Sequence, residues 1–154
     1  MKVWSVPLQI AARLLAPVLL ALSLVVLYRG HHLPGGGFIG GLLAASGIGL
    51  VLLGHGLEAA RRMLRVEPRS LIAGGLGTAV VSGLFGPLLE GAAFMSGVWL
   101  PAFELPLLGS VHLGTPLLFD VGVYLTVVGF VLMCLFALVE ADELAGEEHE
   151  RRMQ

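Results

Sequence analysis

The sequence is poor in charged residues and in cysteine. Charged side chains make up only 13% of its 154 residues, about half of the roughly 25% that is typical of a soluble domain. The single cysteine, Cys134, has no partner within the chain for a disulfide or a thiolate metal site. Lysine and arginine form no basic stripe interleaved with aromatic residues. The sequence therefore predicts no nucleic-acid binding.

Apolar residues dominate instead. They make up 56% of the chain, and the mean hydropathy is +0.91. Four stretches reach the roughly 20 residues that an α-helix needs to cross the hydrocarbon core of a bilayer. They predict transmembrane helices at approximately 8–29, 37–60, 70–95 and 115–140. Because apolar and polar residues do not alternate with period 2, we predict an all-α integral membrane protein with four transmembrane helices.

Basic residues gather in the loop between the second and third predicted helices, at Arg61, Arg62, Arg65 and Arg69. The positive-inside rule places such a loop in the cytoplasm, and four spans then give an N-in/C-in topology. Residues 1–140 are the predicted membrane domain. Residues 141–154 are predicted to form a polar, acidic cytoplasmic tail, as a helical extension or a frayed end. Arg13, inside the first span, is expected to reach the nearby interface with its long side chain.

A glycine-rich motif opens the second predicted helix. Its residues are Pro34, Gly35, Gly36, Gly37, Phe38, Ile39, Gly40 and Gly41. Glycine tolerates positive φ and lets another backbone approach closely. A helix that begins here also leaves several N–H groups in need of an acceptor. Two interpretations stay open, a tight turn with close helix packing or a contact with an ion or water. The motif also has the G-x-G-x-x-G spacing of dinucleotide sites, but it lies between predicted membrane helices and not in a βαβ unit, so we predict no dinucleotide binding.

A few ionisable residues lie in or beside the predicted helices, toward the predicted outer side. They are Asp120, Glu90, His31, His32 and His112. Such groups are candidates for an ion route, because a charge exposed to lipid is costly. They are also typical of helix ends that face water. His55 and Glu58 share one face of the second predicted helix at its cytoplasmic end, where we expect a capping or interface role. The polar residues form no catalytic arrangement, so we expect no enzyme, no cofactor and no metal site.

The glycine motif, preceded by Gly30 and His31, resembles the B subunit of the Mrp-type (Mnh-type) multisubunit sodium/proton antiporters. The resemblance implies a small subunit of a large complex in the bacterial cytoplasmic (inner) membrane. That complex is related to the membrane arm of respiratory complex I and exchanges cytoplasmic sodium ions for external protons. The implied partners are complex I-like A and D subunits, small C, E, F and G subunits, and the lipid bilayer. One departure is that His32 and Leu33 stand where relatives more often have Asn and a small residue.

Two alternatives to an antiporter subunit stay open. One is the equivalent subunit of an ion-pumping redox complex of the membrane-bound hydrogenase type, and the other is a structural scaffold without ion contact. The four predicted spans contain no lysine, whereas the related proton paths generally use buried lysine and glutamate. We therefore expect the main proton machinery in other subunits. This chain would then complete a subunit interface, an outer-side ion route, or both.

Overall fold

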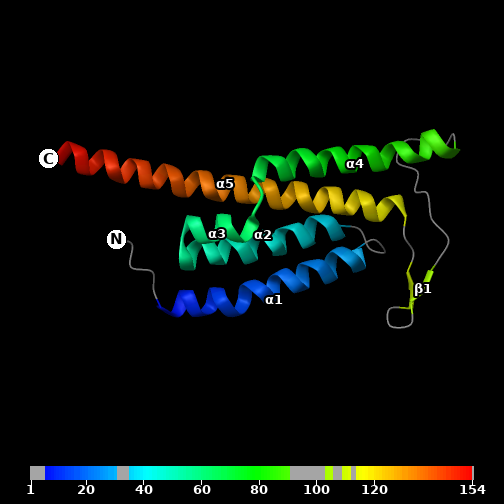
Figure 1. The fold of residues 1–154 in the computed structure, drawn as a ribbon, viewed down its shortest axis with the longest axis horizontal. Coiled ribbons are helices and arrows are strands. Elements are labelled where there is room, and N and C mark those ends of the chain that lie inside the picture. The colour runs from blue at the N-terminus through cyan, green and yellow to red at the C-terminus, as the bar shows by residue number, and fades with distance from the viewer. Residues whose placement is uncertain (1–5, 31–34, 91–102, 106–108, 112–113, 154) are drawn as a thin grey trace.

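A computed structural model describes residues 6–30, 35–90, 103–105, 109–111 and 114–153 (Figure 1). These residues form five helices and two short strands: α1 (Val6–Gly30), α2 (Gly36–His55), α3 (Leu57–Leu64), α4 (Pro68–Glu90), β1 (Phe103–Leu105), β2 (Gly109–Val111) and α5 (Thr115–Met153). The two antiparallel strands pair Glu104 with Ser110 in the connection before α5. The sequence did not predict this small hairpin. The helical membrane architecture it predicted is confirmed.

Three of the described helices, α1, α2 and α5, are long and apolar enough to cross a membrane. The predicted third span corresponds to α4, which is 23 residues long but is not among those three. A count of four spans therefore stays a prediction. The predicted polar tail at residues 141–154 is not a separate unit, because α5 continues without a break to Met153. Of the two forms expected for the tail, the structure has the helical extension.

The centre of the fold is α2, which packs against α1 on one side and α5 on the other (Figure 1). Its buried positions are mostly glycine and alanine, and these small residues let the neighbouring backbones approach closely. The main apolar cluster joins α2, α3 and α5. Its buried members are Ala44, Ala45, Ile48, Leu52, Ala60, Val128, Leu132 and Phe136. By contrast, α1 buries only Ala12, Ala16 and Ser23, so most of its surface is left for lipid or other subunits.

The second predicted span, approximately 37–60, contains parts of two helices in the structure, because α2 stops at His55 and α3 begins at Leu57. Gly56 takes φ 87° and ψ 174°, a conformation that favours glycine and turns the chain. Hydrophobic residues continue on both sides of this glycine, so composition alone gave no boundary. The short α3 then folds back along α2 (Figure 1). His55 and Glu58 consequently do not share a helix face as predicted.

The two ends of α5 have different neighbours. Gly129 of α5 lies so close to the start of α4 that a Cβ there would be 2.6 Å from the carbonyl oxygen of Pro68. A Cβ on Gly75 would be 2.6 Å from the carbonyl oxygen of Gly122. Thus α4 runs antiparallel to α5 along the half nearer Thr115. The half beyond Gly129 packs against α3, through the cluster that contains Ala60 and Phe136. Helix α2 packs along both halves, from Gly37 beside Asp120 to Gly49 beside Leu135.

Candidate functional site

The candidate site lies where the glycine motif at the start of α2 meets the start of α5. Gly35 precedes α2 with φ 96°, in the left-handed region that costs a residue with a Cβ about 1–2 kcal/mol. Its carbonyl oxygen accepts a hydrogen bond from the Ile39 N–H at 3.0 Å. The glycine therefore makes the sharp entry into the helix that the motif predicted.

The glycines of the motif divide between two helix contacts. Gly36 packs on Gly30, and a Cβ on Gly40 would lie 2.9 Å from the carbonyl oxygen of Ser23, so both face α1. On the next face, Gly37 packs on the backbone of Asp120, and a Cβ on Gly41 would lie 2.9 Å from the Cβ of Val127 in α5. The spacing of four residues places each pair on one side of the helix. This geometry favours the interpretation of close helix packing.

The remaining apolar residues of the motif point elsewhere. Phe38 is 53% exposed and Ile39 is 50% exposed. They lie on the side of α2 that contacts neither α1 nor α5, where lipid or another subunit can cover them. Phe38 is thus part of the motif in sequence but not part of the packed junction.

Asp120 lies in the second turn of α5 and is partly buried. Its backbone supports Gly37, so the carboxylate is held at the point where α2 begins. The sequence singled out the glycine motif and Asp120 separately, and the structure brings them into contact. The polar residue one turn farther along α5 is Tyr124, which lies on the same helix face as Asp120.

A partly buried hydrogen bond joins α1 and α5 one helical turn from Asp120, toward the C-terminus of α5. Ser23 is fully buried, and its Oγ donates to the Leu20 carbonyl oxygen at 2.7 Å. Because a hydroxyl has only one proton, Ser23 must accept from the Tyr124 hydroxyl, which lies 3.1 Å away. The sequence analysis missed both residues. A tyrosine four residues after Asp120 was the available signal, whereas one serine in an apolar run gave none.

The other predicted site residues lie beyond what the structure describes. Pro34, His31, His32 and His112 fall outside the described residues. Glu90 is the last residue of α4, and its side chain is also outside the described part. Of the five predicted ion-route candidates, Asp120 is the one whose side chain lies in the described part of the chain. Among the described residues, no group of three or more His, Cys, Asp or Glu side chains is placed to hold a metal ion.

A known family matches most of these helices. The domain described as related to the MnhB subunit of Na⁺/H⁺ antiporter matches residues 7–133. This chain belongs to that family. The match begins within α1 and ends within α5, so it includes the glycine motif, Ser23, Asp120 and Tyr124.

Relatives of this MnhB-related chain are similar to it along nearly their whole length. The B subunit of the Na⁺/H⁺ antiporter of Alkalihalophilus pseudofirmus is 36% identical over 138 residues, which cover 90% of this chain and 94% of that protein. The B subunit of the Na⁺/H⁺ antiporter of Bacillus subtilis is 38% identical over 135 residues, covering 88% of this chain and 93% of that protein.

A solved structure is similar in fold as well. A chain in the structure of the Mrp complex from Dietzia sp. DQ12-45-1b matches 87% of this chain with a TM-score of 0.71 and 39% identity. Only 14% of that longer chain is covered by the match.

A second polar contact joins α1 and α2 at the end opposite to Asp120. The exposed Arg13 side chain donates its Nε–H to Nε2 of His55, the last residue of α2, at 3.3 Å, and its expected position at the membrane interface stays a prediction. The neutral imidazole therefore carries its proton on Nδ1. This atom is buried and has no hydrogen-bond partner among the described residues. In the MnhB-related chain, α1 thus makes two side-chain hydrogen bonds to other helices, one between Ser23 and α5 and one between Arg13 and α2.

Proposed function

We propose that this chain is the B subunit of a multisubunit Na⁺/H⁺ antiporter complex in the bacterial cytoplasmic membrane. The observation that carries the proposal is its similarity, along almost the whole chain, to two proteins named as B subunits of Na⁺/H⁺ antiporters. The sequence left a redox-driven complex and a structural scaffold open as alternatives. The names of the relatives support the antiporter.

The surface of α1 supports a function inside a larger complex. Its large apolar side chains are widely exposed, for example Leu14 at 65% and Val18 at 59%. Helices in lipid associate through close packing, and α1 uses only a narrow stripe of small residues against α2. The rest of α1 is available to lipid and to neighbouring subunits. We propose that those neighbours are the other subunits of the antiporter.

Within the complex, we assign this chain a subunit interface and a part of an outer-side ion route. Asp120 is the proposed ion-contacting group, because it is a partly buried carboxylate at the start of an uncharged membrane segment, Val121–Val139. The Tyr124 hydroxyl, which donates to Ser23, lies one turn farther in. Oxygen atoms of this kind are the ligands that hard cations prefer. The glycine motif positions Asp120 by supporting its backbone.

Loss of this chain is expected to abolish sodium-driven proton exchange by the complex. The test expresses the full subunit set, with and without the chain, in a host that lacks other Na⁺/H⁺ antiporters. A pH-sensitive dye then reports proton movement across inverted membrane vesicles when sodium is added. Exchange that persists without the chain would contradict the proposed function. Exchange that starts only when an electron donor is supplied would favour the redox complex instead.

The proposed N-in/C-in topology has its own test, which uses single cysteines in a Cys134→Ala background. Glu58 is a suitable inner position, because it is exposed on α3 and its replacement keeps every arginine of the basic loop. Arg29, exposed at the end of α1, is a suitable outer position. A membrane-impermeant maleimide added to intact cells is expected to label the Arg29→Cys chain and not the Glu58→Cys chain. The reverse labelling pattern would invert the topology.

A further inference from the structure

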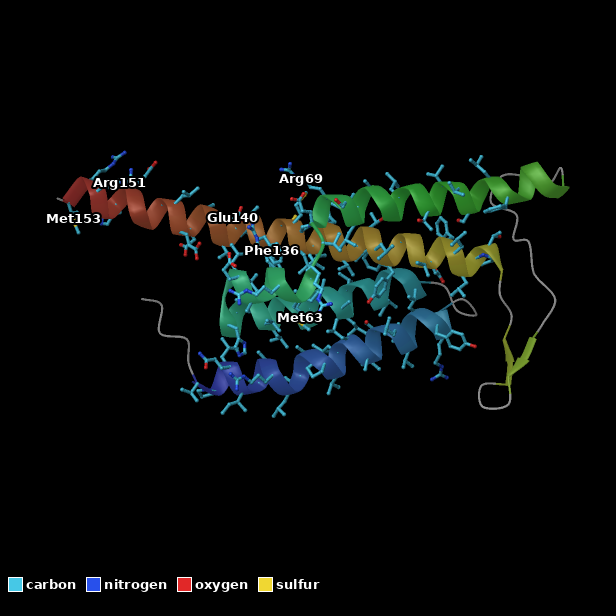
Figure 2. All side chains as sticks on the ribbon, viewed as in Figure 1. Met63, Arg69, Phe136, Glu140, Arg151 and Met153 are labelled. Carbon is cyan, nitrogen blue, oxygen red and sulfur yellow. The ribbon has the colours of Figure 1, made fainter. Side chains whose placement is uncertain are left out.

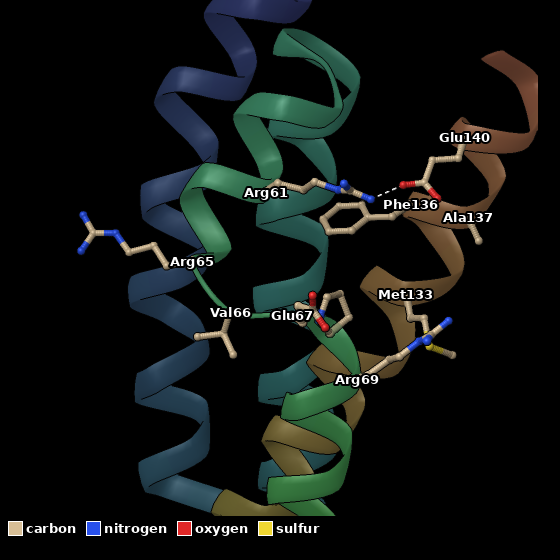
Figure 3. Close-up of a pocket in the computed structure, with 10 residues that line it drawn as sticks. Arg61, Arg65, Val66, Glu67, Arg69, Met133, Phe136, Ala137 and Glu140 are labelled. Carbon is tan, nitrogen blue, oxygen red and sulfur yellow. Dashed lines mark hydrogen bonds and ion pairs between the residues drawn. The ribbon is translucent and has the colours of Figure 1, made fainter. Parts of the chain in front are cut away.

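A cavity of about 490 Å³ opens between α5 and the connection from α3 to α4 (Figure 3). Its volume lies within the range of ligand sites, about 300–1,000 Å³. Arginines and apolar side chains line much of it: Arg61, Arg65, Arg69, Met133, Phe136 and Ala137. In Figure 3, Arg61 and Arg69 extend toward α5, whereas Arg65 extends away from it. The cavity thus combines cationic side chains with an apolar wall.

Only one of these arginines is paired within the described part of the chain. Arg61 pairs with Glu140, and its guanidinium carbon lies 5.9 Å from the centre of the Phe136 ring. Arg65 and Arg69 have no carboxylate partner among the described residues. Apart from the Arg61–Glu140 pair, these two arginines are opposed by one carboxylate in the lining, that of Glu67. The cavity therefore carries a net positive charge.

The depth of the two unpaired arginines makes this charge significant. The uncharged segment of α5 from Val121 to Val139 is about 28 Å long at 1.5 Å per residue, close to the thickness of the hydrocarbon core. Pro68, between the two arginines, lies beside Gly129 near the middle of that segment. Glu140 lies about 16 Å farther along α5. If Val121–Val139 is the part of α5 that crosses the bilayer, the backbones of both arginines lie within the hydrocarbon thickness, where an unpaired charge is costly.

We infer that this cavity binds the phosphate group of an anionic phospholipid from the cytoplasmic leaflet. Arginine binds phosphate oxygens through its fork of N–H donors. A lipid drawn inward would place its phosphate against Arg69, which extends toward α5, and its acyl chains against Val66, Met133 and Ala137. Arg65 extends to the other side of the connection and would add its charge to the attraction without direct contact. Basic cavities between membrane helices on the cytoplasmic side commonly bind anionic head groups. The inference rests on the membrane placement of the helices and not on antiport.

The test measures phosphatidylglycerol binding to the purified, delipidated complex by native mass spectrometry. An Arg65→Gln/Arg69→Gln double variant is expected to bind the lipid about 30-fold more weakly, from roughly fivefold for each arginine near a membrane surface. The matched control is Arg62→Gln, which removes an exposed guanidinium from α3 that does not line the cavity. This control is expected to bind as the unmodified complex does. Phosphatidylcholine is expected to bind weakly to all three.

Each contrary outcome has a distinct meaning. Equal binding by the double variant overturns the site, and equal weakening by Arg62→Gln replaces it with diffuse attraction to the bilayer. Displacement of the lipid by millimolar inorganic phosphate would identify free phosphate as the ligand and overturn the lipid assignment. Loss of a neighbouring subunit from the double variant, with lipid binding unchanged, would instead mean that an acidic protein segment occupies the cavity.

A second variant covers the case in which the double variant does not assemble. Ala137 lines the cavity and is exposed, so Ala137→Trp fills the space without changing any charge. It is expected to remove the bound phosphatidylglycerol from an assembled complex. Ala141→Trp, one turn farther along α5 and outside the lining, is the control that should keep the lipid. Full lipid retention by Ala137→Trp would overturn the proposal independently of the arginines.

Discussion

Gly37→Ala is expected to lower the yield of assembled complex at least about tenfold, because a methyl group at this position overfills a packed contact. The added Cβ would collide with the carbonyl group of Asp120, which is backbone and part of a helix. A flexible side chain could move aside, but this carbonyl cannot move without shifting α5 away from α2. The effect is therefore expected to exceed that of an ordinary overpacked core position.

The matched control is Gly77→Ala in α4. Gly77 is also a helical glycine, but a Cβ there would meet no atom within 4 Å. Alanine favours helix over glycine by about 1 kcal/mol, so this variant should assemble normally. Assembly is measured on native gels from membranes that contain equal amounts of the tagged chain. If Gly37→Ala assembles as well as Gly77→Ala, the close contact between the motif and α5 is wrong.

A conservative substitution at an exposed position of the same motif tests whether the motif tolerates change away from its packed glycines. Ile39 is half exposed, whereas the neighbouring glycines of the motif pack on α1 and α5. Ile39→Val removes one methylene at the same depth of α2 without touching the junction. Its complex should form normally, which shows that the motif is sensitive on two faces of the helix and tolerant on the third.

The membrane character of this chain could be predicted from its sequence because it depends on composition and segment length. Neither the 13% of charged residues nor four long apolar stretches fit a soluble fold. The end of α2 was different. Gly56 ends the helix through its backbone conformation. Gly47, Gly49 and Gly54 precede it in the same segment, and the sequence does not indicate which of the four glycines ends the helix.

The depth of the basic loop depended on tertiary packing. Residues 61–69 lie between two predicted spans, and the sequence therefore predicted a loop at the membrane surface. In the structure α3 folds back along α2, and α4 starts beside the middle of α5 (Figure 2). Hydropathy reports which segments are apolar, but not at which level two of them pack. The glycine pairs that set this level, Gly75 with Gly122 and Gly129 with Pro68, are recognisable only in contact.

The candidate site was predicted in part. Proline and glycine at the start of α2 are typical of a turn, and a carboxylate near the start of a membrane helix is conspicuous, so Asp120 and the motif were both found. That they touch could not be predicted, because no local pattern indicates that α2 and α5 run parallel with Gly37 level with Asp120. Ser23 and Tyr124 are 101 positions apart, and their hydrogen bond depends on the same packing.

Asp120→Asn is expected to leave assembly intact and to lower sodium-driven proton exchange about tenfold or more, as expected for loss of a charged group that contacts the ion. Asparagine keeps the size of the side chain and caps or supports a helix start nearly as well as aspartate. The contact between Gly37 and residue 120 involves only backbone atoms, so the substitution leaves it unchanged. What asparagine cannot supply is the negative charge. The measurement is dye-monitored exchange in inverted vesicles, normalised to assembled complex.

Glu143→Gln is the matched control, since it removes one carboxylate charge from the exposed extension of the same helix. Its exchange rate should equal that of the unmodified complex. A purely structural role for Asp120 makes a different prediction, because the positive end of the α5 dipole favours a carboxylate by only about 0.3–1 kcal/mol. In that case Asp120→Asn would slightly lower stability and leave transport unchanged. Normal exchange by a fully assembled Asp120→Asn complex would therefore reduce Asp120 to a helix-start residue and leave the ion route to other subunits.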